Sequence, residues 1–167
     1  MDLYLLRHGI AADHGDPRYP SDDDRPLTPE GHRKMLQEAR GIKALGLRFD
    51  LILSSPVLRA RQTAGIVAGE LGAMDLLAFS PHLSTAGDGR ALVRQLNEQY
   101  PDRDSVLLAG HEPYLGGMVS KLVGGEEGFA VDVKKGSLCL LRAGQLRWGR
   151  CATLCWLLTP AQLRAIR

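Results

Sequence analysis

Two arginines and two histidines stand where apolar stretches of the chain end abruptly. Arg7 and His8 directly follow the first apolar run, Arg59 lies just beyond a second, and His111 follows a third. Arginine binds phosphoryl oxygens through a planar, permanently charged fork. Neutral imidazole is a nucleophile that can carry a phosphoryl group covalently. These side chains predict phosphoryl transfer if the fold brings them together.

This chemistry requires no metal. Phosphoryl transfer depends mainly on in-line positioning and on stabilising charge at the equatorial oxygens, which two arginines and a second imidazole can supply. The sequence contains no HExxH pattern, no glycine-rich Walker loop and no DxD pair at a strand end, which are common sites for metal-dependent chemistry. We therefore expect a metal-independent enzyme without a cofactor.

The elements that must position these residues are visible in the hydrophobic pattern. Apolar runs predict strands over 3–6, 51–53, 106–109, 138–141 and 154–158, and a weaker one over 76–79. Helical spacing, bounded by Thr, Pro and Gly signals, predicts helices over 28–46, 57–71, 90–100 and 113–123 and a short one from 159. Alternating strands and helices predict a three-layer α/β/α sandwich with a largely parallel central sheet. Ligands bind at the carboxyl ends of such strands.

Bulk properties narrow the class of protein. A chain of 167 residues favours one domain spanning 1–167. The net charge of +2 is too small to indicate nucleic-acid binding. Three cysteines without CxxC spacing predict small buried residues in a reducing compartment. We expect no secretory leader, and the sequence contains no apolar stretch of roughly 18 residues. We expect a cytoplasmic monomer that binds neither membranes nor nucleic acid.

The ordered set of motifs resembles the histidine phosphatase superfamily, also called phosphoglycerate-mutase-like. Arg-His-Gly at 7–9 is similar to its signature, 54–64 to its second block, and Gly-His at 110–111 to the block of its second histidine. The short chain and Arg-Pro-Leu-Thr at 25–28 resemble the SixA-type phosphohistidine phosphatases. The resemblance implies a phosphoglycerate-mutase-like fold and phosphatase activity.

The same resemblance implies roles for individual residues. His8 would be the nucleophile that becomes phosphorylated, while Arg7, Arg59 and His111 would bind the phosphoryl group and stabilise its transfer. Arg25 is either a further phosphate or substrate contact or the partner of neighbouring aspartates in a structural ion pair.

One departure from the larger family bears on the substrate. The segment 80–88, where phosphoglycerate-mutase-like enzymes usually carry a glutamate general acid, contains no glutamate. An alkoxide leaving group needs a proton, whereas protonated phosphohistidine releases neutral imidazole, whose reference pKa is about 6.5. The missing acid therefore favours an N–P bond, although Asp88 or Asp13 could substitute for it.

We therefore expect a phosphohistidine phosphatase that works through phospho-His8 on a phosphorylated protein. One alternative is a phosphatase for a small phosphorylated metabolite, with the same four residues and an added acid such as Asp88. Another is a phosphate-binding or docking module without turnover. It would bind phosphate but form no phosphoenzyme.

Overall fold

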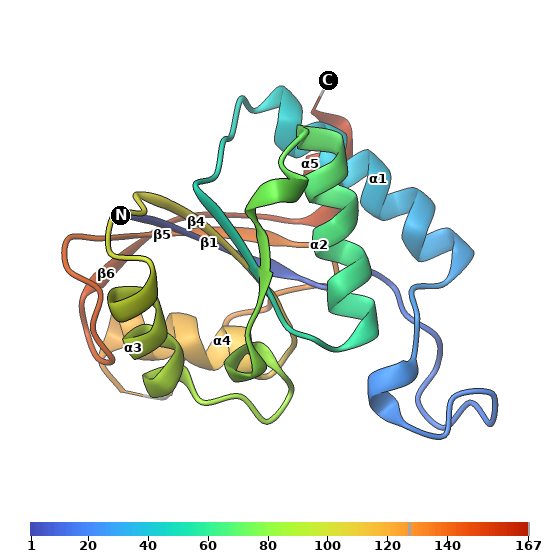
Figure 1. Cartoon of the computed structure of the whole chain (residues 1–167), viewed down its shortest axis with the longest axis horizontal. Helices are drawn as coiled ribbons and strands as arrows, with labels where there is room; N and C mark the ends of the chain where they lie inside the picture. Colours follow the sequence, from blue (N-terminus) through green and yellow to red (C-terminus); the bar gives the residue numbers. More distant parts are fainter. Residues whose placement is uncertain (127, 167) are drawn as a thin grey trace.

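A six-stranded sheet forms the centre of the computed structural model, which describes residues 1–126 and 128–166 (Figure 1). Its strands are β1 (Asp2–Arg7), β2 (Leu51–Ser54), β3 (Leu77–Phe79), β4 (Ser105–Gly110), β5 (Leu138–Ala143) and β6 (Ala152–Leu158). They lie in the order β3-β2-β4-β1-β5-β6. The pairs β1–β4, β2–β4 and β2–β3 are parallel, whereas β5 runs antiparallel to both β1 and β6. The expected largely parallel sheet is confirmed, and β5 is its reversed strand.

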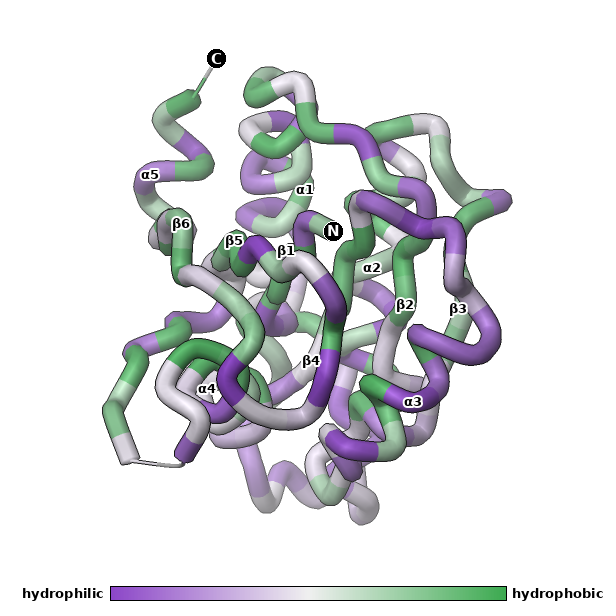
Figure 2. The backbone as a smooth tube through the Cα atoms, turned by 90° about the vertical axis from the view of Figure 1, so that its left-hand side faces the viewer, coloured by the Kyte–Doolittle hydropathy of each residue, from purple (hydrophilic) through white to green (hydrophobic). Residues whose placement is uncertain are grey.

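Helices cover both faces of this sheet, which confirms the three-layer α/β/α architecture. They are α1 (Pro29–Ala44), α2 (Leu58–Leu71), α3 (Gly89–Gln99), α4 (Tyr114–Val119) and α5 (Pro160–Ala165). In Figure 1, α1, α2 and α5 lie on one side of the strands, and α3 and α4 lie on the other. Figure 2 shows hydrophobic residues along the strands and hydrophilic residues in the loop that precedes β4.

The alternation of side chains along β1 explains the two layers. Leu3 and Leu5 belong to the apolar cluster that contains residues of α3 and α4. Tyr4 and Leu6 belong to the cluster that contains residues of α1, α2 and α5. A parallel strand buried on both faces reads as a continuous apolar run because both alternating sets are covered.

Local signals set most of the helix ends. The Thr28 side chain accepts a hydrogen bond from the backbone of Gly31 at the start of α1. Gly72 ends α2 in the left-handed conformation, with φ of +65°. Thr159 and Gln162 form a capping box at the start of α5. These ends agree with the predicted boundaries to within about two residues, the usual uncertainty of helix ends.

One expectation is refined by the structure and another needs correction. The helix predicted over 113–123 is α-helical only as far as Val119 and continues as a π turn over Ser120–Gly124. Its Ser120 hydroxyl bonds to the following loop, donating to the Glu126 carbonyl and accepting from Gly128 N. Cys139 is buried as expected, but Cys151 is only half-buried, and Cys155 is exposed on the edge strand β6. Within the described parts of the chain, none of the helices is long and apolar enough to cross a membrane.

Candidate active site

The neighbouring strands β1 and β4 bring two of the predicted residues together. They run parallel, with Arg7 aligned with Gly110, so the residue that follows each strand emerges at the same edge of the sheet. Those residues are His8 and His111, whose ring centroids lie 5.1 Å apart. Both side chains are buried. The sequence alone predicted this convergence, and the strand register is its cause.

His8 is held in one tautomer. Its Nδ1 lies 2.8 Å from the carbonyl oxygen of Gly9. A carbonyl can only accept, so Nδ1 carries the hydrogen and the lone pair is on Nε2. Burial lowers the pKa of His8 to about 3; the bond to Gly9 opposes this shift, and the nearby charges of His111, Arg59 and Arg7 add to it. The imidazole is therefore neutral at pH 7, as a nucleophile must be.

His111 is fixed by the segment that follows β2. Its Nε2 lies 2.9 Å from the Ser55 hydroxyl, and Ser55 also accepts from Val57 N. Burial, followed by the charge of Arg59, lowers the pKa of His111 to about 4. Its Nδ1 is buried and has no hydrogen-bond partner among the described residues. The role of Ser55 is readable only from the structure, because a serine after a strand is a common feature.

The charges of both predicted arginines act on the two histidines. Arg7 Nη1 donates to the Val133 carbonyl at 2.8 Å, and Arg59 Nη1 donates to the Asp22 carbonyl at 2.6 Å. The Nε atoms of both arginines are buried without a partner among the described residues. Buried donors are normally satisfied. With His111 Nδ1, these atoms are available to hold the oxygens of a phosphoryl group.

Thr63 joins the turn that follows His8 to the helix that carries Arg59. Its hydroxyl accepts from Gly9 N at 3.1 Å and donates to the Arg59 carbonyl at 2.8 Å. The sequence alone predicted no role for Thr63. Its presence in the segment 54–64 was the available signal, but the partner of a buried threonine cannot be read from spacing.

Arg25 is engaged by an aspartate. Its Nε donates to Asp22 Oδ1 at 2.8 Å, and its Nη1 donates to the Ala12 carbonyl at 2.5 Å. Asp22 Oδ2 also accepts from Arg59 Nη2 at 2.8 Å. Burial alone would raise the pKa of Asp22, but the bond from Arg25 and the charge of Arg59 outweigh it, and the net pKa is lowered. Arg25 was expected to be either a substrate contact or the partner of an aspartate, and the structure contains its ion pair with Asp22.

Both carboxylates considered as acids are exposed, unlike the two histidines. Asp88 caps α3, its Oδ1 accepting from Arg90 N at 2.9 Å and from Ala91 N at 3.1 Å. The backbone bond from Ala91 is the main cause of its lowered pKa. Asp13 is exposed in the loop. Across residues 1–126 and 128–166, no group of three or more His, Cys, Asp or Glu side chains is arranged to hold a metal ion.

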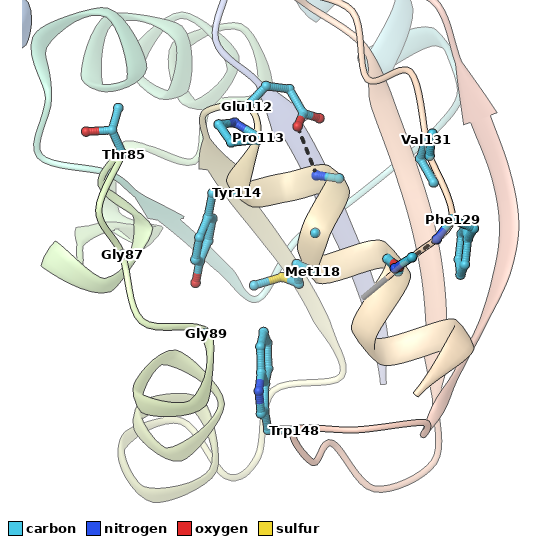
Figure 3. Close-up of a pocket in the computed structure, with 15 residues that line it drawn as sticks. Thr85, Gly87, Gly89, Glu112, Pro113, Tyr114, Met118, Phe129, Val131 and Trp148 are labelled. Carbon is cyan, nitrogen blue, oxygen red and sulfur yellow. Dashed lines mark hydrogen bonds between the residues drawn. The ribbon is translucent and has the colours of Figure 1, made fainter. Parts of the chain in front are cut away.

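A cavity of about 700 Å³ opens along α4 (Figure 3), and none of His8, His111, Arg7 and Arg59 is among the residues that line it. Glu112, the residue after His111, lines it together with Tyr114, Met118 and Trp148. Glu112 Oε2 accepts from Gly116 N at 3.2 Å, whereas Oε1 is buried without a partner among the described residues. Burial raises the pKa of Glu112, and the Gly116 bond and the charge of Arg7 oppose this only in part.

Comparison with known proteins identifies the family. Residues 3–80 match the profile of the histidine phosphatase superfamily (branch 1). The chain is 32% identical over 127 residues to the phosphohistidine phosphatase SixA of Escherichia coli strain K12, covering 75% of this chain and 76% of that protein. The chain belongs to the histidine phosphatase superfamily. Within it, the chain is of the SixA type and is a phosphatase.

Other relatives extend the likeness of this histidine phosphatase to nearly the whole chain. An uncharacterized protein of Picosynechococcus sp. is 41% identical over 156 residues, which is 88% of each chain. The solved structure of the protein histidine phosphatase SixA complexed with tungstate superposes with a TM-score of 0.84 at 27% identity, covering 98% of this chain and 99% of that one. The phosphoglycerate-mutase-like fold expected from the motifs is confirmed.

Proposed function

We propose that this phosphatase hydrolyses phosphohistidine on a protein through a covalent phospho-His8 intermediate. The observation that carries the proposal is the state of His8: a neutral ring whose Nδ1–H is held by the Gly9 carbonyl, leaving the Nε2 lone pair for attack. A nucleophile held in one orientation needs little reorganisation to reach the phosphorus atom.

The first step transfers the phosphoryl group. His8 Nε2 bonds to phosphorus as the N–P bond of the substrate breaks, and the electron pair of that bond stays on the leaving ring nitrogen. Arg7, Arg59 and His111 stabilise the charge on the equatorial oxygens through their buried nitrogen donors. In the second step water attacks the phosphorus of phospho-His8, which releases phosphate and restores the neutral ring.

Two of the carboxylates favour an N–P bond over a P–O ester, whereas Glu112, which follows His111 directly, has its pKa raised by burial. Asp22 is held ionised by Arg25 and Arg59, and Asp88 by the backbone of α3, so neither is a ready proton donor. A protonated phosphohistidine leaves as neutral imidazole and needs no such donor. The names of the SixA relatives point in the same direction. The tungstate in the solved SixA structure is a tetrahedral oxyanion like the phosphate that these side chains would hold.

The test is single-turnover cleavage of a phosphohistidine peptide, a phosphoserine peptide and p-nitrophenyl phosphate, with trapping of the phosphoenzyme. We expect phosphohistidine to react fastest through an acid-labile intermediate. His8→Ala should abolish the intermediate and lower the rate by at least about 10³-fold. His32→Ala, which removes an exposed histidine on α1, should change neither. Faster turnover of the phosphoserine peptide would assign the enzyme to ester substrates instead, and bound phosphate without turnover would make it a docking module.

A further inference from the structure

The cavity along α4 has two buried polar atoms without a partner among the described residues, the Tyr114 hydroxyl and Glu112 Oε1, and phosphoryl binding leaves the second unused. Arg7, Arg59 and His111 present donors, as a phosphoryl group requires, but Glu112 Oε1 is a buried acceptor without a partner among the described residues. An acceptor does not bind phosphate oxygens. A ligand that satisfies this oxygen must bring an N–H or O–H group into the cavity.

The surroundings of Glu112 narrow the class of ligand. Its carboxylate interacts electrostatically with Arg7, at the edge of the phosphoryl site, and it follows His111 directly in the chain. In Figure 3 the side chains of Tyr114, Met118 and Trp148 line the cavity on the same side of α4. The Glu112 carboxylate lies at the start of α4, on the other side of that helix from Met118 and Trp148 (Figure 3). An anionic acceptor beside the charge of Arg7 suits a cationic ring that donates an N–H from its edge.

We propose that Glu112 recognises the leaving group of phosphohistidine: its Oε1 accepts the N–H of the ring nitrogen that carries no phosphorus. This inference rests on the proposed function and names the residue that makes the site selective for an N–P bond. It assigns the cavity wall formed by Tyr114, Met118 and Trp148 to the chain that flanks the imidazole ring.

The contact acts directly on the chemistry. A carboxylate beside the ring favours its protonated form, because an opposite charge and a hydrogen bond both stabilise the cation. When His8 takes the phosphoryl group, the electron pair of the N–P bond returns to the ring. The ring then leaves as neutral imidazole, with its N–H still on Glu112. A seryl oxygen has no second nitrogen, so the same contact does nothing for an ester.

The test compares Glu112→Gln with Glu98→Gln, which removes the same charge from the exposed face of α3. The amide oxygen of the Glu112→Gln variant can keep the bond from Gly116, and thermal unfolding checks that the fold is intact. Substrates are a phosphohistidine peptide, phosphoramidate, which has an N–P bond but no ring, and a phosphoserine peptide. We expect Glu112→Gln to lower the single-turnover rate on phosphohistidine about 10- to 100-fold. The phosphoramidate rate should stay within about twofold of wild type, because the lost contact is to the ring alone.

The pH profile gives a second readout that a merely structural role would not produce. With Glu112 in place, the phosphohistidine ring stays protonated to higher pH. In Glu112→Gln the rate should therefore begin to fall at lower pH than in wild type.

Three results would overturn the inference. Equal losses on phosphohistidine and phosphoramidate would place the effect of Glu112 at the phosphoryl centre, and an unchanged phosphohistidine rate would show that Glu112 does not touch the ring. A loss confined to the phosphoserine peptide would make Glu112 a proton donor to an ester oxygen. By contrast, a wild-type enzyme that cleaves phosphoserine and not phosphohistidine overturns the proposed function itself.

Discussion

The strand ends and the loop over residues 10–26 both contribute to the site, but different forces hold them. His8 and His111 are 6% and 1% exposed and are positioned by the β1–β4 ladder and the packing around it. Asp22, from the loop, has a side chain that is 34% exposed and is held by ion pairs with Arg25 and Arg59.

Because different forces hold these two regions, they should respond differently to salt and pH. Packing and buried hydrogen bonds are barely screened by salt, so the histidines keep their geometry and neutral state over a wide range of conditions. The contact between Asp22 and Arg59 is electrostatic and partly exposed, and a phosphoryl oxygen would compete with Asp22 for the same guanidinium. Arg59 is therefore the residue at which the rigid and the adjustable parts of the site meet.

Removing Arg59 should have the largest effect, because both regions depend on it. Arg59→Ala deletes a buried donor that we propose holds the phosphoryl group, and it releases Asp22. We expect kcat/KM to fall about 10²- to 10³-fold. The matched control is Arg61→Ala, on the same helix, whose guanidinium lies over the Phe79 ring instead. A loss of similar size in the control would mean that the positive charge of the helix, and not the Arg59 contact, supports turnover.

The pH dependence of the unfolding free energy reports on the two histidines at the strand ends, His8 and His111. The unfolded chain takes up a proton at each histidine as the pH falls below about 6.5. Folded His8 and His111 do so only near pKa values of about 3 and 4. Their contribution to stability is therefore complete above pH 6.5 and is lost as the pH falls. Between pH 6.5 and 5, wild type should lose about 1.5 kcal/mol more unfolding free energy than His8→Ala.

Urea unfolding at the two pH values measures this difference. His32→Ala should lose as much as wild type, because that side chain is exposed. Equal losses in wild type and His8→Ala would show that His8 does not resist protonation in the folded protein.

The smallest expected effect concerns the loop. Asp22→Asn removes the charge that competes for Arg59, so inorganic phosphate should inhibit at a concentration about three- to fivefold lower. The gain should shrink as salt is added, because the contact is partly exposed. Asp23→Asn, an exposed neighbour, serves as the control. Weaker phosphate inhibition in Asp22→Asn would mean that Asp22 holds Arg59 in place for phosphate instead of competing with it.

The same division explains how far the sequence predicted the molecule. The strands were predictable because a buried parallel strand has a continuous apolar sequence. The convergence of His8 and His111 was predictable because ligands bind at the carboxyl ends of such strands. The contact of Asp22 with Arg59 joins residues 37 positions apart through a loop without periodicity, so spacing could not show it. Glu112 also escaped prediction. A glutamate after a strand is ordinarily a solvated residue, and only the structure shows that Oε1 is buried.

Trp148 also gives the cavity an optical reporter. The chain has two tryptophans, Trp148 on the cavity wall and Trp156 on β6, where its ring lies 5.9 Å from that of Tyr4. A side chain beyond glycine at position 89 would collide with the Trp148 ring, which is pressed against α3. In a Trp156→Phe background the remaining indole emission comes from the cavity wall alone. Entry and departure of a ligand could then be followed as a fluorescence change in a protein whose nucleophile has been removed, separating occupancy from turnover.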